Sequence, residues 1–169
     1  MNKREKLCAW LFEVTKLPYA KLCKQKRAAW KLSSTDLLTF PVGSLGYETG
    51  KFLKTNGFEL IDKLESHDVY HVITGMSTSV KDEVGMQFLL LGNGKRSLYL
   101  FSTVGICFFL LPEHLSYFIR CYKTGKRYHS IFKLNLLAEL NTSVLVLRKQ
   151  LLKHSNNRLK VFTHLSNHY

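Results

Sequence analysis

Two histidines, an aspartate and a glutamate whose spacing could suit one metal ion fall within residues 65–83, "ESHDVYHVITGMSTSVKDE". His67 and His71 are four positions apart, and on a helix this spacing places both imidazoles on one face, close enough to bind a single ion. Asp68 lies about 100° around the helix from His67 and can approach the same ion from the edge of that face. The segment is therefore a candidate metal site on a helix.

Glu83 can join this site only if the chain turns back on itself. A straight helix would carry it about 18 Å from His71. Gly75 and the "MSTS" segment after it supply the break. Ser79, followed three residues later by Asp82, resembles a capping box, so we expect a second helix whose first turn presents Glu83 to the first helix.

Two imidazoles and two carboxylates suit one divalent ion, with zinc favoured, or Fe(II) or Mn(II) if water completes a larger shell. A histidine pair alone is weak evidence for a metal site. The same spacing would arise from one core histidine with hydrogen-bonded ring nitrogens and one histidine on the surface. Val69, Val72 and Ile73 make the other face of the helix apolar, so the polar residues are expected to be partly buried. Buried charges need a partner, and a cation is the simplest one.

The elements that must position this site are helices. Alternation typical of strands is nowhere sustained, and the 169 residues predict an all-α, single-domain bundle of about six or seven helices with an apolar groove. "SVLVL", residues 143–147, is the best strand candidate. Apolar spacing and capping signals predict helices over 5–17, 47–56, 60–74, 80–91, 98–111 and 113–123. A cap within 141–143 and a stripe of Val144, Leu147 and Leu151 predict a further helix near the C-terminus.

The net charge of +13 favours polyanionic partners, namely nucleic acid, anionic lipid headgroups or phosphorylated small molecules. The sequence has no motif that recognises a groove of DNA or RNA, so we expect no nucleic-acid binding. The basic stretch "KLCKQKRAAWK", residues 21–31, is either a solvated helical face or a membrane-surface patch with an aromatic anchor.

The cysteines and the apolar runs indicate a protein of a reducing compartment. No CxxC pair is present, and Glu13 and Lys16 interrupt the N-terminal apolar run, so neither a disulfide framework nor a signal peptide is expected. The run over 98–111 is shorter than the about 20 residues of a spanning helix and predicts a buried helix or one lying against a membrane. The four cysteines are Cys8, Cys23, Cys107 and Cys121.

The opening segment resembles a known family. "HDVYHVITGMSTSVKDE" fits H-D-x-x-H, eleven residues, then E, the signature of the coenzyme Q (ubiquinone) biosynthesis protein family named for the fourth gene of the yeast pathway series. "PVGSLGYETGKFLKTNGF" and "YKTGKRYHSIFKLNLLAEL" are similar to other segments of that family, and the resemblance covers roughly residues 38–140. The chain looks like a compact, divergent, bacterial-type member, because Val42 replaces the usual glutamate and the segment before His67 is short.

The resemblance implies a metal held by the residues that match the motif, His67, Asp68, His71 and Glu83. It also implies a groove for a polyprenyl lipid or prenylated quinone precursor and peripheral attachment to the cytoplasmic face of the inner membrane. Family members are described as organisers of a biosynthetic complex and as catalysts of oxidative decarboxylation, in which the ring carboxyl is removed and that carbon (C1) is hydroxylated. The implied partners are an anionic membrane surface, other quinone-biosynthesis proteins and a second copy in a homodimer.

Within one domain we therefore expect a basic amphipathic helical segment over 1–37, a metal- and lipid-binding core over 38–140, and a C-terminal helix and tail over 141–169. Three functions remain open. An enzyme would keep a vacant metal position, whereas a non-catalytic lipid-binding scaffold would have a closed four-ligand shell. The third is a hydrolase in which H-D-x-x-H resembles H-E-x-x-H and Asp68 acts as general base.

Overall fold

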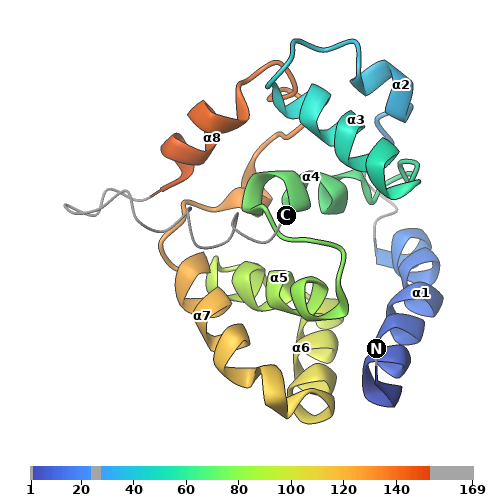
Figure 1. The fold of residues 1–169 in the computed structure, drawn as a ribbon, viewed down its shortest axis with the longest axis vertical. Helices are drawn as coiled ribbons and strands as arrows, with labels where there is room; N and C mark the ends of the chain where they lie inside the picture. Colours follow the sequence, from blue (N-terminus) through green and yellow to red (C-terminus); the bar gives the residue numbers. More distant parts are fainter. Residues whose placement is uncertain (1, 24–27, 153–169) are drawn as a thin grey trace.

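The computed structural model describes residues 2–23 and 28–152, except for the side chains of residues 16, 17 and 20–23. This part of the chain contains eight α-helices, two 3-10 turns and two isolated β-bridges, and it forms no strand (Figure 1). The expected all-α, single-domain bundle is confirmed. The helices are α1 (Lys3–Cys23), α2 (Ser34–Leu37), α3 (Leu45–Asn56), α4 (Glu65–Thr74), α5 (Val80–Gly92), α6 (Leu98–Leu110), α7 (Leu115–Gly125) and α8 (Val144–Leu151).

Helix starts and ends follow local capping chemistry. Four helices begin after a serine whose hydroxyl accepts a hydrogen bond from the backbone N–H three residues later, and α3 and α4 end at glycines with left-handed φ values of 67° and 70°. Such a glycine lets the chain reverse direction without steric cost. The capping serines are Ser33, Ser44, Ser79 and Ser97, and the glycines are Gly57 and Gly75.

Several predicted boundaries were wrong. The helix expected over 5–17 continues through Pro18 to Cys23, and the helix expected over 113–123 divides into a 3-10 turn, Pro112–His114, and α7. The strand alternative for "SVLVL" was also wrong, because the segment forms the first turn of α8 and no strand lies beside it in the described structure. The helix count exceeds the prediction because a capping box at Ser33 creates the one-turn helix α2.

Helix α4 begins at Glu65 and not near Leu60, where it was predicted. Lys63 adopts a left-handed φ of 68°, which interrupts any helix that would start earlier. The Glu65 side chain is buried, and it accepts a hydrogen bond from the backbone N–H of Trp30 at 2.9 Å. This contact ties the start of the metal-site helix to a segment 35 residues away in sequence.

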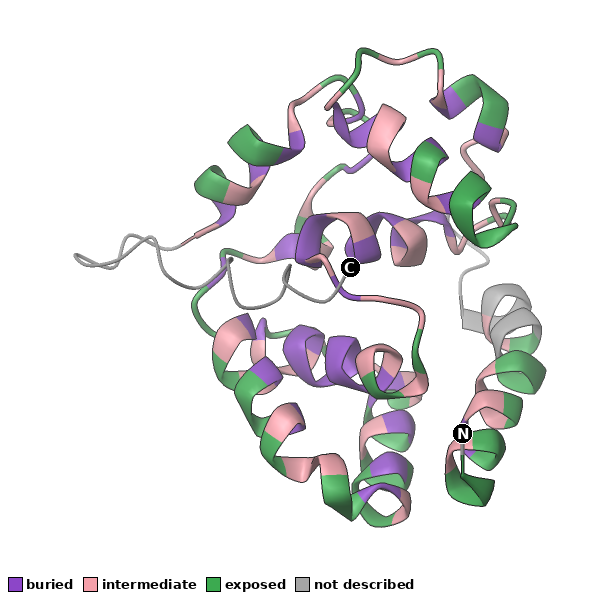
Figure 2. Cartoon of the chain, viewed as in Figure 1, coloured by how far each residue is buried: buried purple, intermediate pink, exposed green. Residues whose placement is uncertain are grey.

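Helices α5 and α7 cross so closely that two glycines are required at the crossing. A Cβ on Gly92 would lie 2.0 Å from the carbonyl oxygen of Tyr122, and a Cβ on Gly125 would lie 2.0 Å from that of Leu89. α6 also packs against α5, and α5 is among the most buried helices (Figure 2). The helix that carries Glu83 is therefore held rigidly.

One buried amide side chain joins the end of α5 to the segment after α7. The Asn93 Nδ2 donates to the carbonyl oxygens of Gly125 at 3.2 Å, Tyr128 at 3.2 Å and His129 at 2.9 Å. Its Oδ1 accepts from the backbone N–H of Ile131 at 2.9 Å. Asn93 thus contacts four backbone groups of a buried connection, with its two N–H protons shared among the three carbonyl oxygens.

Several large apolar residues of α1 face outward. Leu7, Trp10 and Val14 are exposed, whereas Cys8 is buried against Cys107 of α6 with the two sulfurs 3.9 Å apart. Cys8, Cys107 and Cys121 are free cysteines, while the Cys23 side chain lies outside the described residues. Most of the basic patch predicted over 21–31 also lies outside them.

Among the described residues, no single helix has both the length and the apolar composition required to cross a membrane. Within the same residues, α6 and the segment Pro112–Gly125 reach that length and apolar composition together, as a pair bent by 102°.

Candidate metal centre

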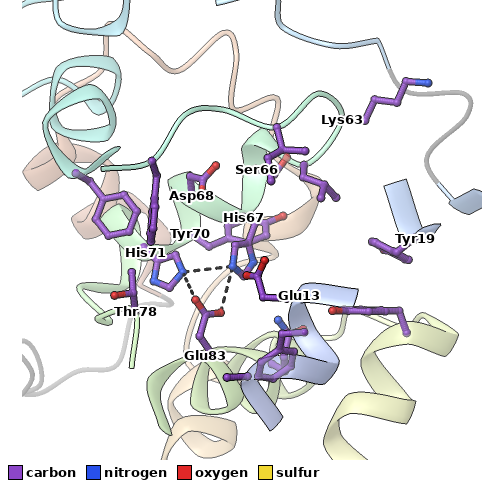
Figure 3. Close-up of a pocket in the computed structure, with 18 of the residues that line it drawn as sticks. Glu13, Tyr19, Lys63, Ser66, His67, Asp68, Tyr70, His71, Thr78 and Glu83 are labelled. Atoms are coloured by element: carbon purple, nitrogen blue, oxygen red, sulfur yellow. Dashed lines mark hydrogen bonds and ion pairs between the residues drawn. The ribbon is translucent and has the colours of Figure 1, made fainter. Parts of the chain in front are cut away.

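The predicted reversal of the chain brings three of the four candidate ligands together. His67 and His71 project from α4, and Glu83 meets them from the first turn of α5 (Figure 3). The Glu83 Oε2 lies 3.1 Å from His67 Nε2, and its Oε1 lies 3.1 Å from His71 Nε2. The two Nε2 atoms are 3.4 Å apart. One ligand atom from each residue lies within 4.8 Å of the others, so this group could hold a metal ion.

The His71 ring is fixed in the orientation that a ligand needs. Its Nδ1–H donates to the carbonyl oxygen of Met76 at 3.0 Å, and its face stacks on Phe52 with the ring centroids 5.1 Å apart. Since the proton is on Nδ1, the neutral imidazole presents its Nε2 lone pair to the group. A lone pair facing the Glu83 carboxylate at 3.1 Å is repulsive unless a proton or a metal ion lies between them. The donor set therefore fits a cation.

The pKa values of the group reflect this shared need for positive charge. Burial raises the pKa of Glu83, but hydrogen bonds from His67 and His71 outweigh burial and lower that pKa to about 2. Burial lowers the pKa of His71, but its hydrogen bond with Glu83 outweighs burial and leaves that pKa above its ordinary value. Without a metal, a proton on His71 takes the place of the ion.

Asp68 lines the same cavity but does not belong to the group of three. In Figure 3 its carboxylate points away from Glu83. Burial raises the pKa of Asp68 to about 6, and the nearby His67 and His71 oppose that rise only in part. Its role as a fourth ligand stays a prediction.

A cavity of about 490 Å³ adjoins the metal centre, and all three ligands line it. Its polar end also includes Ser66, whose hydroxyl is buried and has no hydrogen-bond partner in the described structure. Most of the remaining wall is aromatic or aliphatic, and Tyr19 of α1 stacks on Tyr99 of α6 at 4.4 Å. The apolar and aromatic lining residues are Ala9, Phe12, Tyr19, Phe52, Phe58, Ile61, Leu64, Tyr70, Val80 and Tyr99.

The run over 98–111 contributes little to the cavity wall. Of that helix only Tyr99 lines the cavity, because Leu100 and Cys107 pack into the core and most of the other side chains face outward. The sequence analysis missed Phe52 and Phe58, which come from α3 and from the residue after its C-cap. The sequence alone does not distinguish apolar residues that line a cavity from apolar residues that fill a core.

Metal binding is expected to weaken as the pH falls, because protons compete with the ion for the imidazoles. In metal-free protein, the raised pKa of His71 stabilises the fold. This stabilisation is fully present below pH 6.5 and is lost as the pH rises through the pKa that His71 has in the folded protein. The lowered pKa of Glu83 adds stability above 4.5 that disappears as the pH falls towards about 2. This group should therefore stabilise the metal-free protein most between pH 4.5 and pH 6.5.

Thermal unfolding with chelator and with added metal tests this expectation. We expect the metal to raise Tm by at least about 5 °C at neutral or slightly alkaline pH and by much less near pH 5. An equal rise at both pH values would contradict the assignment of these histidines as ligands.

Comparison with known proteins yields a fold relationship. No family model matches the sequence, and no curated protein matches it. The crystal structure of a protein from Nostoc punctiforme, provisionally named a ubiquinone biosynthesis protein, is similar with a TM-score of 0.59 and 21% sequence identity. The match covers 91% of this chain and 83% of that chain. The two proteins therefore share a fold.

Proposed function

We propose that this protein binds one divalent metal through His67, His71 and Glu83 and catalyses oxidative decarboxylation, with C1 hydroxylation, of a prenylated aromatic acid held in the adjoining cavity. The observation that carries the proposal is a group of two histidines and one glutamate that lines a largely apolar cavity. The name of the Nostoc punctiforme protein agrees with such a substrate.

The number of ligands favours an enzyme over a scaffold. Three protein ligands leave a position for water or substrate, as in catalytic zinc sites, and two histidines with one carboxylate are also typical of non-haem iron oxygenases. Iron or manganese is thus as compatible with the donor set as zinc. If Asp68 completed a closed shell, the alternative function as a lipid-binding scaffold would be favoured instead. The hydrolase hypothesis required Asp68 beside the metal, and no observation favours it.

The cavity lining combines polar and apolar groups. Lys63 and Lys95 line it and supply positive charge for a carboxylate, while Ser66 offers a hydroxyl that has no hydrogen-bond partner among the described residues. The aromatic wall suits a ring and an isoprenoid chain, and a volume of about 490 Å³ is within the usual range for ligand sites. An isoprenoid longer than the cavity would have to leave it towards the surface.

The residues of this chain have separable roles. When bound, the metal would supply Lewis-acid or redox chemistry next to the ring. His71 would hold it in a fixed direction, because Met76 and Phe52 set the imidazole orientation. The apolar wall would exclude water from the reacting carbon.

Turnover of a prenylated 4-hydroxybenzoate tests the proposal. With dioxygen and a two-electron reductant the reaction balances as ArCOOH + O₂ + 2[H] giving ArOH + CO₂ + H₂O, and mass spectrometry detects the phenol. We expect turnover with one of iron, manganese or zinc, and a loss of at least about 100-fold in Glu83→Gln. Protein that binds both metal and prenyl lipid but gives no product with any metal would support the scaffold.

A further inference from the structure

The outward face of α6 is apolar and uncharged. Leu98 is 86% exposed and Phe109 is 80% exposed, although both are large apolar residues. The exposed surface of a helix in a globular protein is normally polar, so a whole apolar face indicates a binding surface. The exposed residues of this face are Leu98, Phe101, Ser102, Gly105, Ile106, Phe108 and Phe109 (Figure 2).

We propose that this face of α6 binds the surface of an anionic lipid bilayer, with the helix lying along the boundary between headgroups and acyl chains. A helix of 13 residues is about 20 Å long, too short to cross a hydrocarbon core of about 30 Å. The 102° bend after α6 turns the chain away from the line of the helix. The geometry therefore favours a helix that lies on the membrane.

Charge favours a membrane over a second copy of the chain. A net charge of +13 makes two copies repel each other, whereas it attracts the chain to anionic headgroups. Basic residues also flank the face. Arg96 is exposed just before α6, and Arg4 is exposed near the other end, where it pairs with Glu113 at 3.0 Å. An exposed apolar face on a strongly basic chain is suited to an anionic membrane surface.

The same helix contributes to the cavity of the metal centre. Tyr99 projects from α6 into the cavity wall and stacks on Tyr19 of α1. A bilayer bound along α6 would thus lie one helix away from the cavity. Passage of a prenylated ligand between the bilayer and the cavity rests on the proposed function. The membrane contact itself does not rest on it.

Vesicle co-sedimentation tests the docking face. We expect the protein to bind phosphatidylcholine vesicles that contain about a third phosphatidylglycerol, and to bind pure phosphatidylcholine at least about tenfold less well. Leu98→Glu with Phe109→Glu should reduce binding to the anionic vesicles at least about tenfold. The matched control is Val42→Glu with Leu145→Glu, since these residues are 81% and 67% exposed. Val42 precedes α3 and Leu145 belongs to α8, and both of these helices lie away from α6 (Figure 1).

Both double variants lower the net charge equally, so their difference isolates the α6 face. Equal binding by the two variants, or no binding by the unaltered protein, would overturn the proposal. So would an α6 variant that converts a dimer to a monomer in sedimentation and still binds vesicles, because the face would then join two copies. Metal content measured on the same samples separates the proposals: loss of vesicle binding with metal retained supports the docking face whether or not turnover is found.

Discussion

Replacing His67 and His71 together by alanine is expected to reduce the bound metal from about one ion per chain to less than about a tenth of that. Each substitution removes one of the three donors, and Glu83 alone would bind a divalent ion only weakly at the surface of the cavity. Elemental analysis of protein purified in parallel, after equal exposure to metal, measures the effect. Equal metal content in the double variant would refute the site.

The control for this variant is His129→Ala, which removes an exposed histidine whose contacts in the described structure are made by its backbone. His71 is buried, so its truncation leaves a cavity and can also destabilise the fold. Glu83→Gln avoids that problem because it keeps the size of the side chain and removes only the charge. Circular dichroism and a similar loss of metal in Glu83→Gln would show that the ligands, and not the fold, determine binding.

The grouping of His67, His71 and Glu83 was predictable from sequence because the contacts that define it are local. The spacing of His67 and His71 is a property of one helix, and Gly75 and Ser79 encode the reversal that delivers Glu83. Only half of the predicted capping box forms. Ser79 caps α5, but the Asp82 carboxylate accepts hydrogen bonds from Ser77 and Tyr117.

The contacts that refine the site were not predictable, because they depend on packing between distant segments. Phe52 reaches His71 only because α3 packs on α4, and a phenylalanine in α3 has the same sequence pattern whether it meets a core or an imidazole. The same reason explains the missed start of α4. The left-handed Lys63 and the contact between Glu65 and Trp30 are tertiary features without a local sequence signal.

Helix α6 illustrates a further limit of sequence patterns. "LYLFSTVGICFFL" contains no charged residue, so its periodicity predicts a helix but does not indicate which side faces solvent. The structure resolves the direction by burying Leu100 and Cys107 and exposing Leu98 and Phe109. An apolar helix with one exposed face is thus identified only after packing is known.

Asn93→Asp is expected to lower the free energy of unfolding by at least about 3 kcal/mol. The substitution keeps the shape of the side chain but replaces the amide donor with an oxygen that faces the carbonyls of Gly125, Tyr128 and His129. Three buried acceptors would lose their partner next to a new negative charge, and each unsatisfied group costs about 1–3 kcal/mol. Urea unfolding followed by circular dichroism measures the change.

Asn56→Asp is the matched control, since Asn56 is exposed and its Nδ2 donates to a single carbonyl, that of Phe52, at 2.8 Å. Its cost should stay below about 1 kcal/mol, because water can replace the lost bond. The pH dependence separates the two positions further. Burial among carbonyls raises the pKa of an aspartate above its ordinary value of about 4, so the penalty at position 93 should shrink as the pH falls and the carboxyl regains a proton that it can donate. A penalty at position 93 no larger than that at position 56 would mean that the Asn93 bonds do not hold the segment after α7 against α5.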